Sequence, residues 1–307
     1  MIVFCDNIKF AEEFLHSSLN WEITDNKNPD FLTFLFKELF INKFLYQAEI
    51  SGFEPWEYLF ICKESEKSQF DVLVEFSKQN FKEPGKLLCI AGSGRNFHGF
   101  RNRNWESLAG NLHLSVYIRP DREIRNFHSG ILAASAVALV QAIDSFPELK
   151  GNAKIKWIND ILIDGAKVSG IITRAQTQGN VVTGTVIGIG MNIFANPCIK
   201  SDSIIPKATC LSEFVRKEKI SLNKVFILVT KQLNLQYENL VIDLFENVLN
   251  FYTSRSLIVG EKVRVLSDPV SGKPEEIYEG TVERIGLNLE LYFKDKLQPV
   301  TKGRLII

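Results

Sequence analysis

Cysteine is scarce in this sequence, and the spacing of its cysteines argues against both a structural zinc site and a disulfide framework. The 307 residues contain five cysteines, no two of them in a C-x-x-C pattern, and four histidines. Without clustered cysteine and histidine ligands, a structural zinc site is not expected, and scattered single cysteines do not indicate a disulfide framework. We therefore interpret the cysteines as reduced, mostly buried thiols.

Targeting signals and long apolar runs are also lacking. The opening residues, MIVFCDNIKFAEEF, have no basic start, no sustained apolar stretch and no small-residue cleavage site, so no secretory signal is predicted. No apolar run approaches the ~20 residues that a membrane-spanning helix needs. The sequence thus predicts a soluble cytoplasmic protein without a membrane partner.

Net charge is absent as well. The chain has 36 basic and 36 acidic side chains, so no overall field favours binding to nucleic acid or to an anionic membrane. Residues 1 to 60 contain no basic recognition helix of the kind found in a DNA-binding helix-turn-helix. We expect no nucleic-acid partner.

Length and hydrophobic content are sufficient for a packed core in two or three domains, because 45% of the residues are hydrophobic and 23% are charged. Strand and helix patterns alternate along the middle of the chain, and short strands separated by turn residues follow Gly260. The predicted fold class is α+β, a central mixed β-sheet with flanking helices plus a small C-terminal SH3-like β-barrel. The predicted boundaries are 1–58 for an N-terminal extension of short helices, 59–256 for the central domain and 257–307 for the barrel.

Several segments carry clear local patterns. EYLFICKES and KLLCIA predict buried strands, SQFDVLVEFSKQNF an amphipathic helix, and SGILAASAVALVQAIDSF a buried helix. Alternating apolar residues around Asp164-Gly165 predict a hairpin with a tight turn. VVTGTVIGIGMNIF predicts a further strand, in which Gly188 and Gly190 mark a close backbone approach.

The segment after KLLCIA, GSGRNFHGFRNRNW, combines glycines and arginines and ends in a tryptophan. Glycine lets a backbone come close to a ligand, and guanidinium groups match phosphate and carboxylate oxygens. The segment fits a nucleotide clamp or a surface turn with solvated arginines, and its tryptophan fits a stacking partner for a base or a core residue. The residues concerned are Gly92, Ser93, Gly94, Arg95, Gly99, Arg101, Arg103 and Trp105.

A second segment, KIKWINDILIDGAKVSGII, places polar residues on both sides of the predicted hairpin turn. Lys156, Asn159 and Asp160 come at the end of one strand, and Lys167 follows the turn with Gly170 beyond it. A lysine that reaches over a glycine into a cleft can stabilise the charge that develops when a carboxylate attacks a phosphate. An exposed hairpin lysine is the alternative interpretation.

Taken in order, these segments resemble the catalytic domain of biotin protein ligases. That family typically shows G-R-G-R-R-G-R-x-W, then N-L-x-x-S, K-W-P-N-D, K-x-x-G-I-L and G-I-G-x-N. This chain has NLHLS, KWIND, KVSGII and GIGMN, with Ile158 in place of the usual proline and Ile172 in place of leucine. GEKVRV and EGTVERIG resemble the C-terminal domain of the same ligases, so the resemblance covers residues 60 to 307.

The resemblance implies a biotin-[acetyl-CoA-carboxylase] ligase, which uses ATP, Mg²⁺ and biotin to form biotinyl-5′-adenylate and passes biotin to a lysine of a biotin carboxyl carrier domain. Lys167 would polarise the biotin carboxylate and the α-phosphate, and Asp160 with Asn159 would organise Mg-ATP, Asp160 being the metal ligand. Trp105 would pack the adenine and Asn192 would hydrogen-bond its edge. The remaining residues implied at the nucleotide are Gly92, Ser93, Gly94, Arg95, Gly99, Arg101, Arg103, Lys156 and Gly170, with Arg95 grouped among the catalytic residues. A homodimer is left open.

The arginine-rich loop departs from the family pattern, and two registers are open. Counting back from Trp105 keeps one glycine and two arginines but puts His98 and Phe100 where arginines belong. Counting forward from Gly92 matches GSGR to G-R-G-R, with extra residues inserted before RNR. The forward register is preferred, because loops tolerate insertions.

The part of the family pattern that contacts biotin is weakly represented. The usual Ser-Thr-Asn stretch has Ser65-Glu66-Lys67 as its nearest candidate, and the usual glutamine before the glycine loop is not evident. Two alternatives therefore stay open. One is a lipoate or octanoate ligase or transferase of the same fold, and the other is a catalytically impaired ligand-binding homologue.

Overall fold

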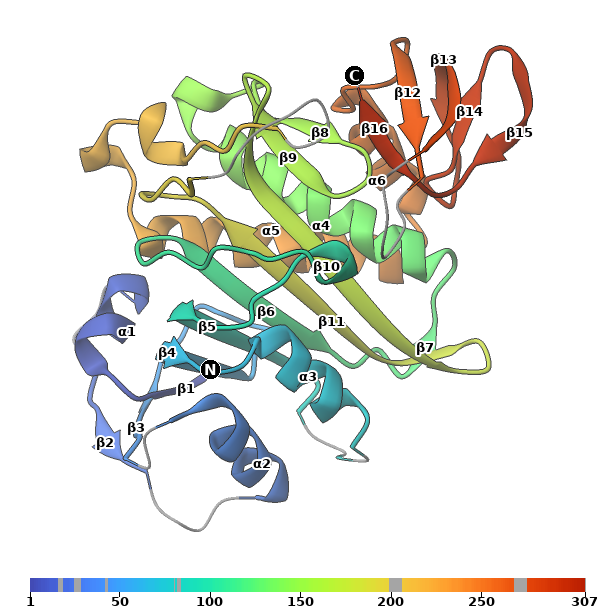
Figure 1. Cartoon of the computed structure of the whole chain (residues 1–307). Coiled ribbons are helices and arrows are strands. Elements are labelled where there is room, and N and C mark those ends of the chain that lie inside the picture. Colours follow the sequence, from blue (N-terminus) through green and yellow to red (C-terminus); the bar gives the residue numbers. More distant parts are fainter. Residues whose placement is uncertain are drawn as a thin grey trace.

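A large mixed sheet forms the body of the protein (Figure 1). The computed structural model describes residues 1–15, 19–24, 29–41, 44–79, 81, 84–198, 206–267 and 275–306. The 11-stranded sheet has the order β2-β3-β1-β4-β5-β6-β11-β10-β9-β8, with β7 paired to β11. β4 is parallel to β1 and to β5, and the remaining neighbours are antiparallel. The strands are β1 (Ile2–Cys5), β2 (Glu22–Ile23), β3 (Tyr46–Glu49), β4 (Tyr58–Ser65), β5 (Lys86–Gly94), β6 (Leu112–Ile118), β7 (Arg122–Glu123), β8 (Lys154–Lys156), β9 (Asp160–Ile163), β10 (Ala166–Gln178) and β11 (Val181–Met191).

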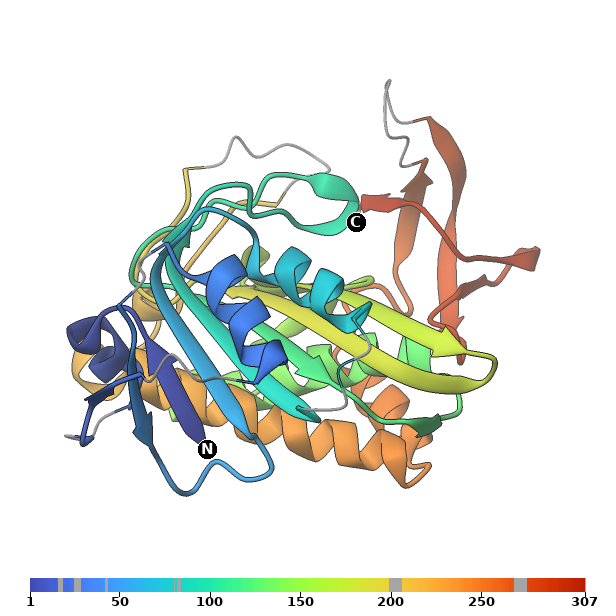
Figure 2. The same ribbon diagram turned by 90° about the horizontal axis from the view of Figure 1, so that it is seen from below.

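Helices cover both faces of this sheet. Figure 2 shows α2 and α3 on one face and the long α5 on the other, where α4 and α6 pack with it. The helices are α1 (Ile8–Leu15), α2 (Asp30–Leu39), α3 (Gln69–Ser77), α4 (Phe127–Asp144), α5 (Leu222–Val241) and α6 (Phe245–Ser254). The predicted α+β class with a mixed central sheet is confirmed.

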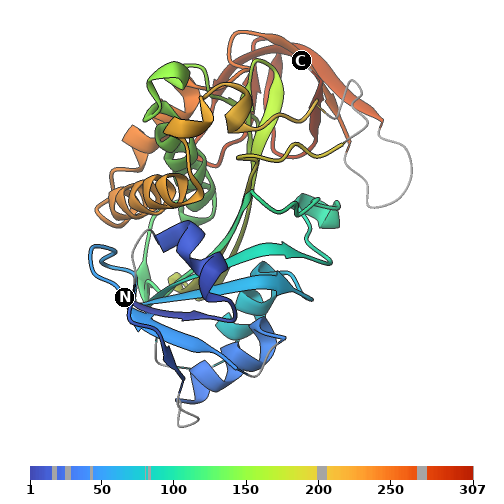
Figure 3. The same cartoon turned by 90° about the vertical axis from the view of Figure 1, so that its left-hand side faces the viewer.

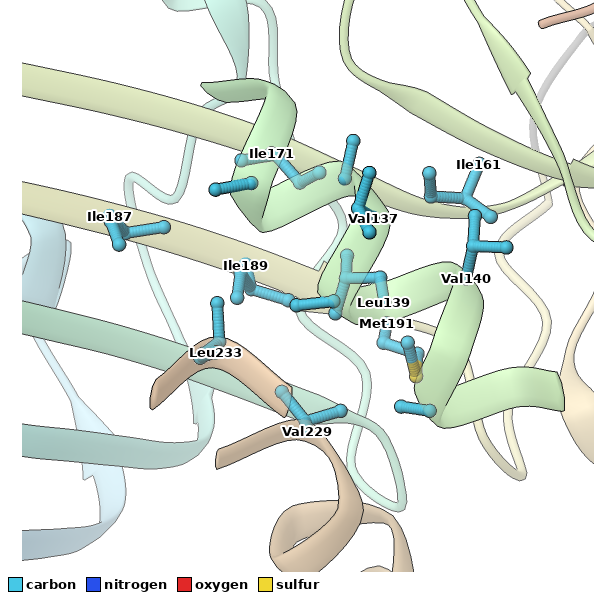
Figure 4. Close-up of a cluster of buried hydrophobic side chains, with 14 of the residues drawn as sticks. Val137, Leu139, Val140, Ile161, Ile171, Ile187, Ile189, Met191, Val229 and Leu233 are labelled. Atoms are coloured by element: carbon cyan, nitrogen blue, oxygen red, sulfur yellow. The ribbon is translucent and has the colours of Figure 1, made fainter. Parts of the chain in front are cut away.

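The main core lies between the sheet and α4. Figure 4 shows Ile171 of β10 and Ile187 and Ile189 of β11 on the side of the sheet where Val137 and Leu139 of α4 lie. Among the described helices, α4 is the one that is long and apolar enough to cross a membrane, but 72% of that stretch is buried inside the fold. We interpret α4 as the core helix of this domain, because its own small and branched side chains are buried on all sides of the helix.

The N-terminal extension differs from its prediction, because it contains strands as well as short helices. β1 pairs with β3 on one side and with β4 on the other, so the extension continues the central sheet. A run of four residues such as IVFC carries little periodicity, and its strand conformation depends on β4, a partner distant in sequence. Figure 3 shows this extension at one end of the molecule and the C-terminal module at the other.

The C-terminal module is all-β, as predicted. Its five strands pair antiparallel in the order β15-β14-β13-β12-β16, and within the described residues no pairing between β15 and β16 closes the sheet into a barrel. The strands are β12 (Lys262–Leu266), β13 (Glu276–Ile285), β14 (Leu291–Phe293), β15 (Lys296–Val300) and β16 (Arg304–Ile306).

Candidate active site

A cleft of about 370 Å³ opens on the face of the sheet that carries α3. Its floor is formed by β6, β10 and β11, and its walls come from the start of α3, the segment after β5 and the C-terminal module. The predicted site residues that it brings together are Gly99, Arg103, Trp105, Asn159, Asp160, Lys167, Gly170 and Asn192. The predicted residues that do not line it are Gly92, Ser93, Gly94, Arg95, Arg101 and Lys156.

The floor exists because glycine alternates with isoleucine along β11. In a strand, successive side chains point to opposite faces. Ile189 therefore points into the core, whereas Gly190 lies on the cleft face opposite Gly170 of β10. The indole of Trp105 rests on this glycine pair, since a Cβ on Gly190 would lie 2.2 Å from Trp105 Cζ2 and one on Gly170 would lie 3.4 Å from Cζ3.

Lys167 and Asp160 form an ion pair beside this indole. Lys167 Nζ lies 2.6 Å from Asp160 Oδ1, with the two side chains 26% and 24% exposed, and 5.4 Å from the centroid of the Trp105 ring. The lysine passes over Gly170, where a Cβ would meet Nζ at 3.0 Å. In this position the ammonium group of Lys167 can stabilise negative charge that develops in the cleft.

The backbone on both sides of this ion pair is fixed by residues distant in sequence. Lys167 N–H donates to Lys207 O at 2.6 Å, and Lys167 O accepts from Thr209 N–H at 2.9 Å. The turn before Asp160 is held by the Tyr252 hydroxyl, which donates to Ile158 O at 2.9 Å. The indole of Trp157 in the same turn donates to Leu289 O at 2.7 Å, so α6 and the C-terminal module both position the turn.

The predicted single hairpin around Asp160 proves to be two. Asp164 and Gly165 adopt φ angles of 48° and 77° between β9 and β10, which confirms the predicted turn. A second turn separates β8 from β9, and Lys156 is the cross-strand partner of Asp160. Burial lowers the pKa of Lys156, the carboxylate of Asp160 opposes this lowering, and neighbouring cations on Arg304, Lys167 and Arg103 add to it.

Asparagine amides connect the cleft to the surrounding loops. Asn159 Nδ2 donates to Ile171 O at 2.6 Å, which ties the β8–β9 turn to β10. Asn192 is 1% exposed, and its amide donates to Thr209 O and accepts from Asn111 Nδ2. Both asparagines line the cleft, and both are held by protein hydrogen bonds.

The glycine and arginine segment divides into a strand and a flap. Gly92, Ser93 and Gly94 belong to β5, where a Cβ on Gly92 would lie 2.6 Å from Lys63 O and one on Gly94 would lie 2.5 Å from the Phe97 ring. Neither glycine adopts positive φ. These glycines therefore allow close packing within the protein, against Lys63 O at Gly92 and against the Phe97 ring at Gly94.

The flap, residues 97–105, is a short hairpin whose two ends are hydrogen-bonded. Trp105 N–H donates to Phe97 O at 2.9 Å, and Gly99 N–H donates to Arg103 O at 2.7 Å. Figure 2 shows the flap in teal on the same side of the sheet as α3. Because Gly99 and Arg103 reach the cleft and Arg95 does not, the geometry favours the register counted back from Trp105.

The lining residues that the sequence did not predict include polar ones at the start of α3 and on β6: Ser68, Gln69, His113 and Ser115. Gln69 is 2% exposed at the start of α3. Its Nε2 donates to Ile90 O at 3.0 Å, and its Oε1 is buried without a hydrogen-bond partner. Buried acceptors are normally satisfied, and because Gln69 lines the cleft, this oxygen is placed to accept from a group that enters it. The NLHLS motif contains two of these residues, but a sequence pattern alone does not say which face of β6 they occupy.

His113 lies under Trp105 in a defined tautomer. Its Nδ1 accepts from Trp105 Nε1–H at 3.4 Å, and its Nε2 lies 3.1 Å from Leu108 O, so Nε2 carries the proton and donates. Burial lowers the pKa of His113 to about 4. The folded state therefore requires the neutral imidazole.

This burial predicts acid sensitivity. The unfolded chain binds a proton at His113 below its ordinary pKa near 6.5, whereas the folded protein resists protonation down to about pH 4. The contribution of His113 to the free energy of unfolding is therefore fully present above about pH 6.5. It falls by up to about 3 kcal/mol as the pH drops towards 4. Urea unfolding from pH 7 to 4.5 measures this slope. The His113→Gln variant keeps a donor for Leu108 O and should lose that part of the slope, and equal slopes in both proteins would contradict the assignment.

Metal binding by protein ligands alone is not indicated. Among the described residues no group of three or more His, Cys, Asp and Glu side chains could hold a metal ion. The carboxylates that line the cleft are Asp160 and Glu106. So few carboxylates suit only an ion such as Mg²⁺, which keeps several waters and can complete its coordination with substrate phosphates.

Comparison with known proteins identifies relatives of the region that builds this cleft. Residues 63–192 match the model of the biotin/lipoate A/B protein ligase family. The chain is 31% identical over 186 residues to the bifunctional ligase/repressor BirA of Bacillus subtilis, a match that covers 60% of this chain and 56% of that protein. It is 32% identical over 126 residues to the biotin-[acetyl-CoA-carboxylase] ligase of Paracoccus denitrificans, covering 39% of this chain and 47% of that protein. The chain thus spans about half the length of the curated relatives that it matches.

The fold has a counterpart among solved structures. The biotin protein ligase of Aquifex aeolicus, solved in complex with biotin and ATP, superimposes with a TM-score of 0.61 at 19% identity, covering 81% of this chain and 98% of that one. At this identity the likeness establishes the fold alone.

Proposed function

Because residues 63–192 match the model of the biotin/lipoate A/B protein ligase family, we propose that this chain is an ATP-dependent biotin protein ligase. In the first step the biotin carboxylate attacks the α-phosphorus of ATP and pyrophosphate leaves. In the second step the amine of a lysine on a biotin carboxyl carrier domain attacks the mixed anhydride, an amide forms and AMP leaves. The observation that carries this proposal is the Lys167–Asp160 pair beside Trp105 on a glycine floor.

The cations around Asp160 suit a triphosphate. Lys167 and Arg103 lie on the catalytic domain and Arg304 comes from β16, and all three line the cleft. Mg²⁺ bound through Asp160 and the phosphates would neutralise part of the remaining charge. Trp105 offers a planar face for adenine, and the flap would limit access of water to the adenylate.

The buried acceptor on Gln69 favours biotin over lipoate. The ureido ring of biotin carries two N–H donors, one of which could reach Gln69 Oε1, with the hydroxyls of Ser68 and Ser115 nearby in the same lining. The dithiolane ring of lipoate and the tail of octanoate have no such donor. A buried oxygen without a partner carries a penalty of about 1 to 3 kcal/mol, and a ligand that relieves it should bind about one order of magnitude or more tighter than one that cannot.

Pyrophosphate exchange tests the proposal. With ATP and Mg²⁺, robust biotin-dependent exchange is expected, with lipoate and octanoate at least about tenfold weaker at equal concentration because of the Gln69 oxygen. Thermal stabilisation by each acid with ATP provides a second readout, since a ligand of the native state raises the melting temperature. Exchange that depends on lipoate and not on biotin would identify lipoate as the substrate instead. No exchange in a folded sample that still binds biotin would favour a ligand-binding homologue.

The proposed setting is a cytoplasmic one, with a carrier domain as the protein partner and no nucleic-acid partner. β1 and β3 of the extension belong to the central sheet, and the charge of the chain is balanced at 36 basic and 36 acidic residues. Both observations support a ligase without an operator-binding role.

A further inference from the structure

His98 connects the flap to α3 through the side chain of Asp71. His98 Nε2 lies 3.0 Å from both carboxylate oxygens of Asp71, and Nδ1 lies 3.2 Å from Gly99 O. Both ring nitrogens thus face oxygen acceptors. A ring nitrogen that carries hydrogen can donate to a carboxylate or a carbonyl oxygen, so the ring is placed to hydrogen-bond to Asp71.

The partner of His98 is placed on a rigid element at the rim of the cleft. Asp71 lies in the first turn of α3, where the positive end of the helix favours a carboxylate. Phe70, which lines the cleft, meets the edge of the His98 ring with centroids 6.2 Å apart at 89°. An ion pair and an aromatic contact therefore join the flap to the helix that starts with Gln69.

Other contacts of the flap include local ones at its tip and packing at its base. Phe100 at the tip has its ring near the guanidinium groups of Arg101 and Arg103, at 5.8 and 5.9 Å. At the base, Phe97 meets His113 with ring centroids 5.8 Å apart. The contact between His98 and Asp71 joins the flap to α3 through side-chain atoms.

We propose that Asp71 and His98 form a clamp that positions the flap over the cleft. The clamp itself involves protein groups alone. Its consequence for catalysis rests on the proposed function, because a flap already in place would retain the adenylate and keep water from it. Asp71 and His98 are positioning residues in this account.

Amide hydrogen exchange on the unliganded full chain tests the clamp directly. In Asp71→Ala and in His98→Ala, exchange at the amides of Gly99 and Trp105 should quicken about fivefold, the effect expected of one exposed ion pair. The double variant should exchange no faster than either single variant, because the two residues act through one contact. Wild-type exchange in both single variants, or fully additive effects in the double, would overturn the proposal.

Two further variants separate a clamp from general destabilisation. His98→Arg keeps a cationic fork that can reach a carboxylate, so it should retain wild-type exchange in the flap. Glu75→Ala removes a carboxylate from the same helix, where it pairs with Lys78, and should leave the flap unchanged. Faster flap exchange in Glu75→Ala, to the extent seen in Asp71→Ala, would show that loss of helix charge rather than the clamp is responsible and would overturn the proposal.

The catalytic consequence has its own readout. In Asp71→Ala, release of free biotinyl-adenylate should rise about fivefold relative to transfer, in line with the same ion-pair contribution, with a smaller change in the rate of adenylate formation. His98→Arg should restore retention. If the wild-type chain shows no biotin-dependent exchange, the proposed function fails while the amide exchange still decides the clamp. If flap exchange is unchanged in a chain that makes adenylate, the clamp alone fails.

Discussion

Replacing Lys167 by alanine is expected to abolish adenylate formation while leaving the fold intact. The ammonium group lies 2.6 Å from Asp160 Oδ1 and faces the cleft beside the Trp105 ring. Losing a charged donor placed at developing charge costs about 100-fold to 1,000-fold in rate. The fold should survive, because the strand pairing at Lys167 uses its backbone N–H and C=O rather than its side chain. Biotin-dependent pyrophosphate exchange and urea unfolding measure the two effects.

Lys154→Ala is the matched control. Lys154 lies on β8 in the same pair of hairpins and does not line the cleft, so its loss should leave exchange within about twofold of the wild type, the range of a surface substitution. Wild-type exchange in Lys167→Ala would remove this lysine from the mechanism. Loss of exchange in both variants would point to damage of the hairpins instead.

Local patterns in the sequence predicted the parts of the fold that depend on neighbouring residues. Asp164-Gly165 specified its turn because both positions need positive φ. The alternation around Gly188 and Gly190 indicated a close backbone approach, and the structure supplies the partners, Ile172 and Phe70 at Gly188 and Trp105 at Gly190.

What the sequence could not predict depends on distant partners. β1 is a strand because β4 lies beside it, and β4 is more than 50 residues away along the chain. Gln69 reads as an ordinary helix residue until the structure shows its oxygen buried at the cleft without a partner. Short strands and single buried polar groups carry no periodic signal, so tertiary context decides them.

The preferred register of the arginine loop shows how a sound local argument can miss a packing constraint. Tolerance of insertions favoured matching from Gly92. The structure places Gly92 inside β5 against Lys63 O and Phe10, and the cleft is reached by the residues just before Trp105. A glycine can be required by a neighbouring strand as well as by a ligand, and one sequence does not separate the two causes.

A methyl group on Gly190 is expected to displace the indole of Trp105, which rests on this glycine in the floor of the cleft. In Gly190→Ala the new Cβ would lie 2.2 Å from Trp105 Cζ2 and 2.3 Å from Cε2, distances at which the indole must move. Trp105 has little freedom, because its N–H is bonded to Phe97 O and its Nε1–H to His113. Overpacking of this kind costs about 1 to 3 kcal/mol of folding stability. If the indole moves, the adenine loses its stacking surface, and ATP affinity should fall by about tenfold or more.

Two companion variants isolate the cause. Gly184→Ala, on the same strand, meets its nearest atom, Tyr117 Cε2, at 3.3 Å, so it should cost less than about 1 kcal/mol and leave ATP affinity unchanged. Trp105→Ala combined with Gly190→Ala removes the clash, and the double variant should recover stability relative to Gly190→Ala without recovering affinity, because the two substitutions share one contact. Urea unfolding and ATP titration with biotin present give both quantities. Recovery of affinity in the double variant would mean that Trp105 blocks the nucleotide rather than holding it, and the glycine floor would then serve the ligand directly.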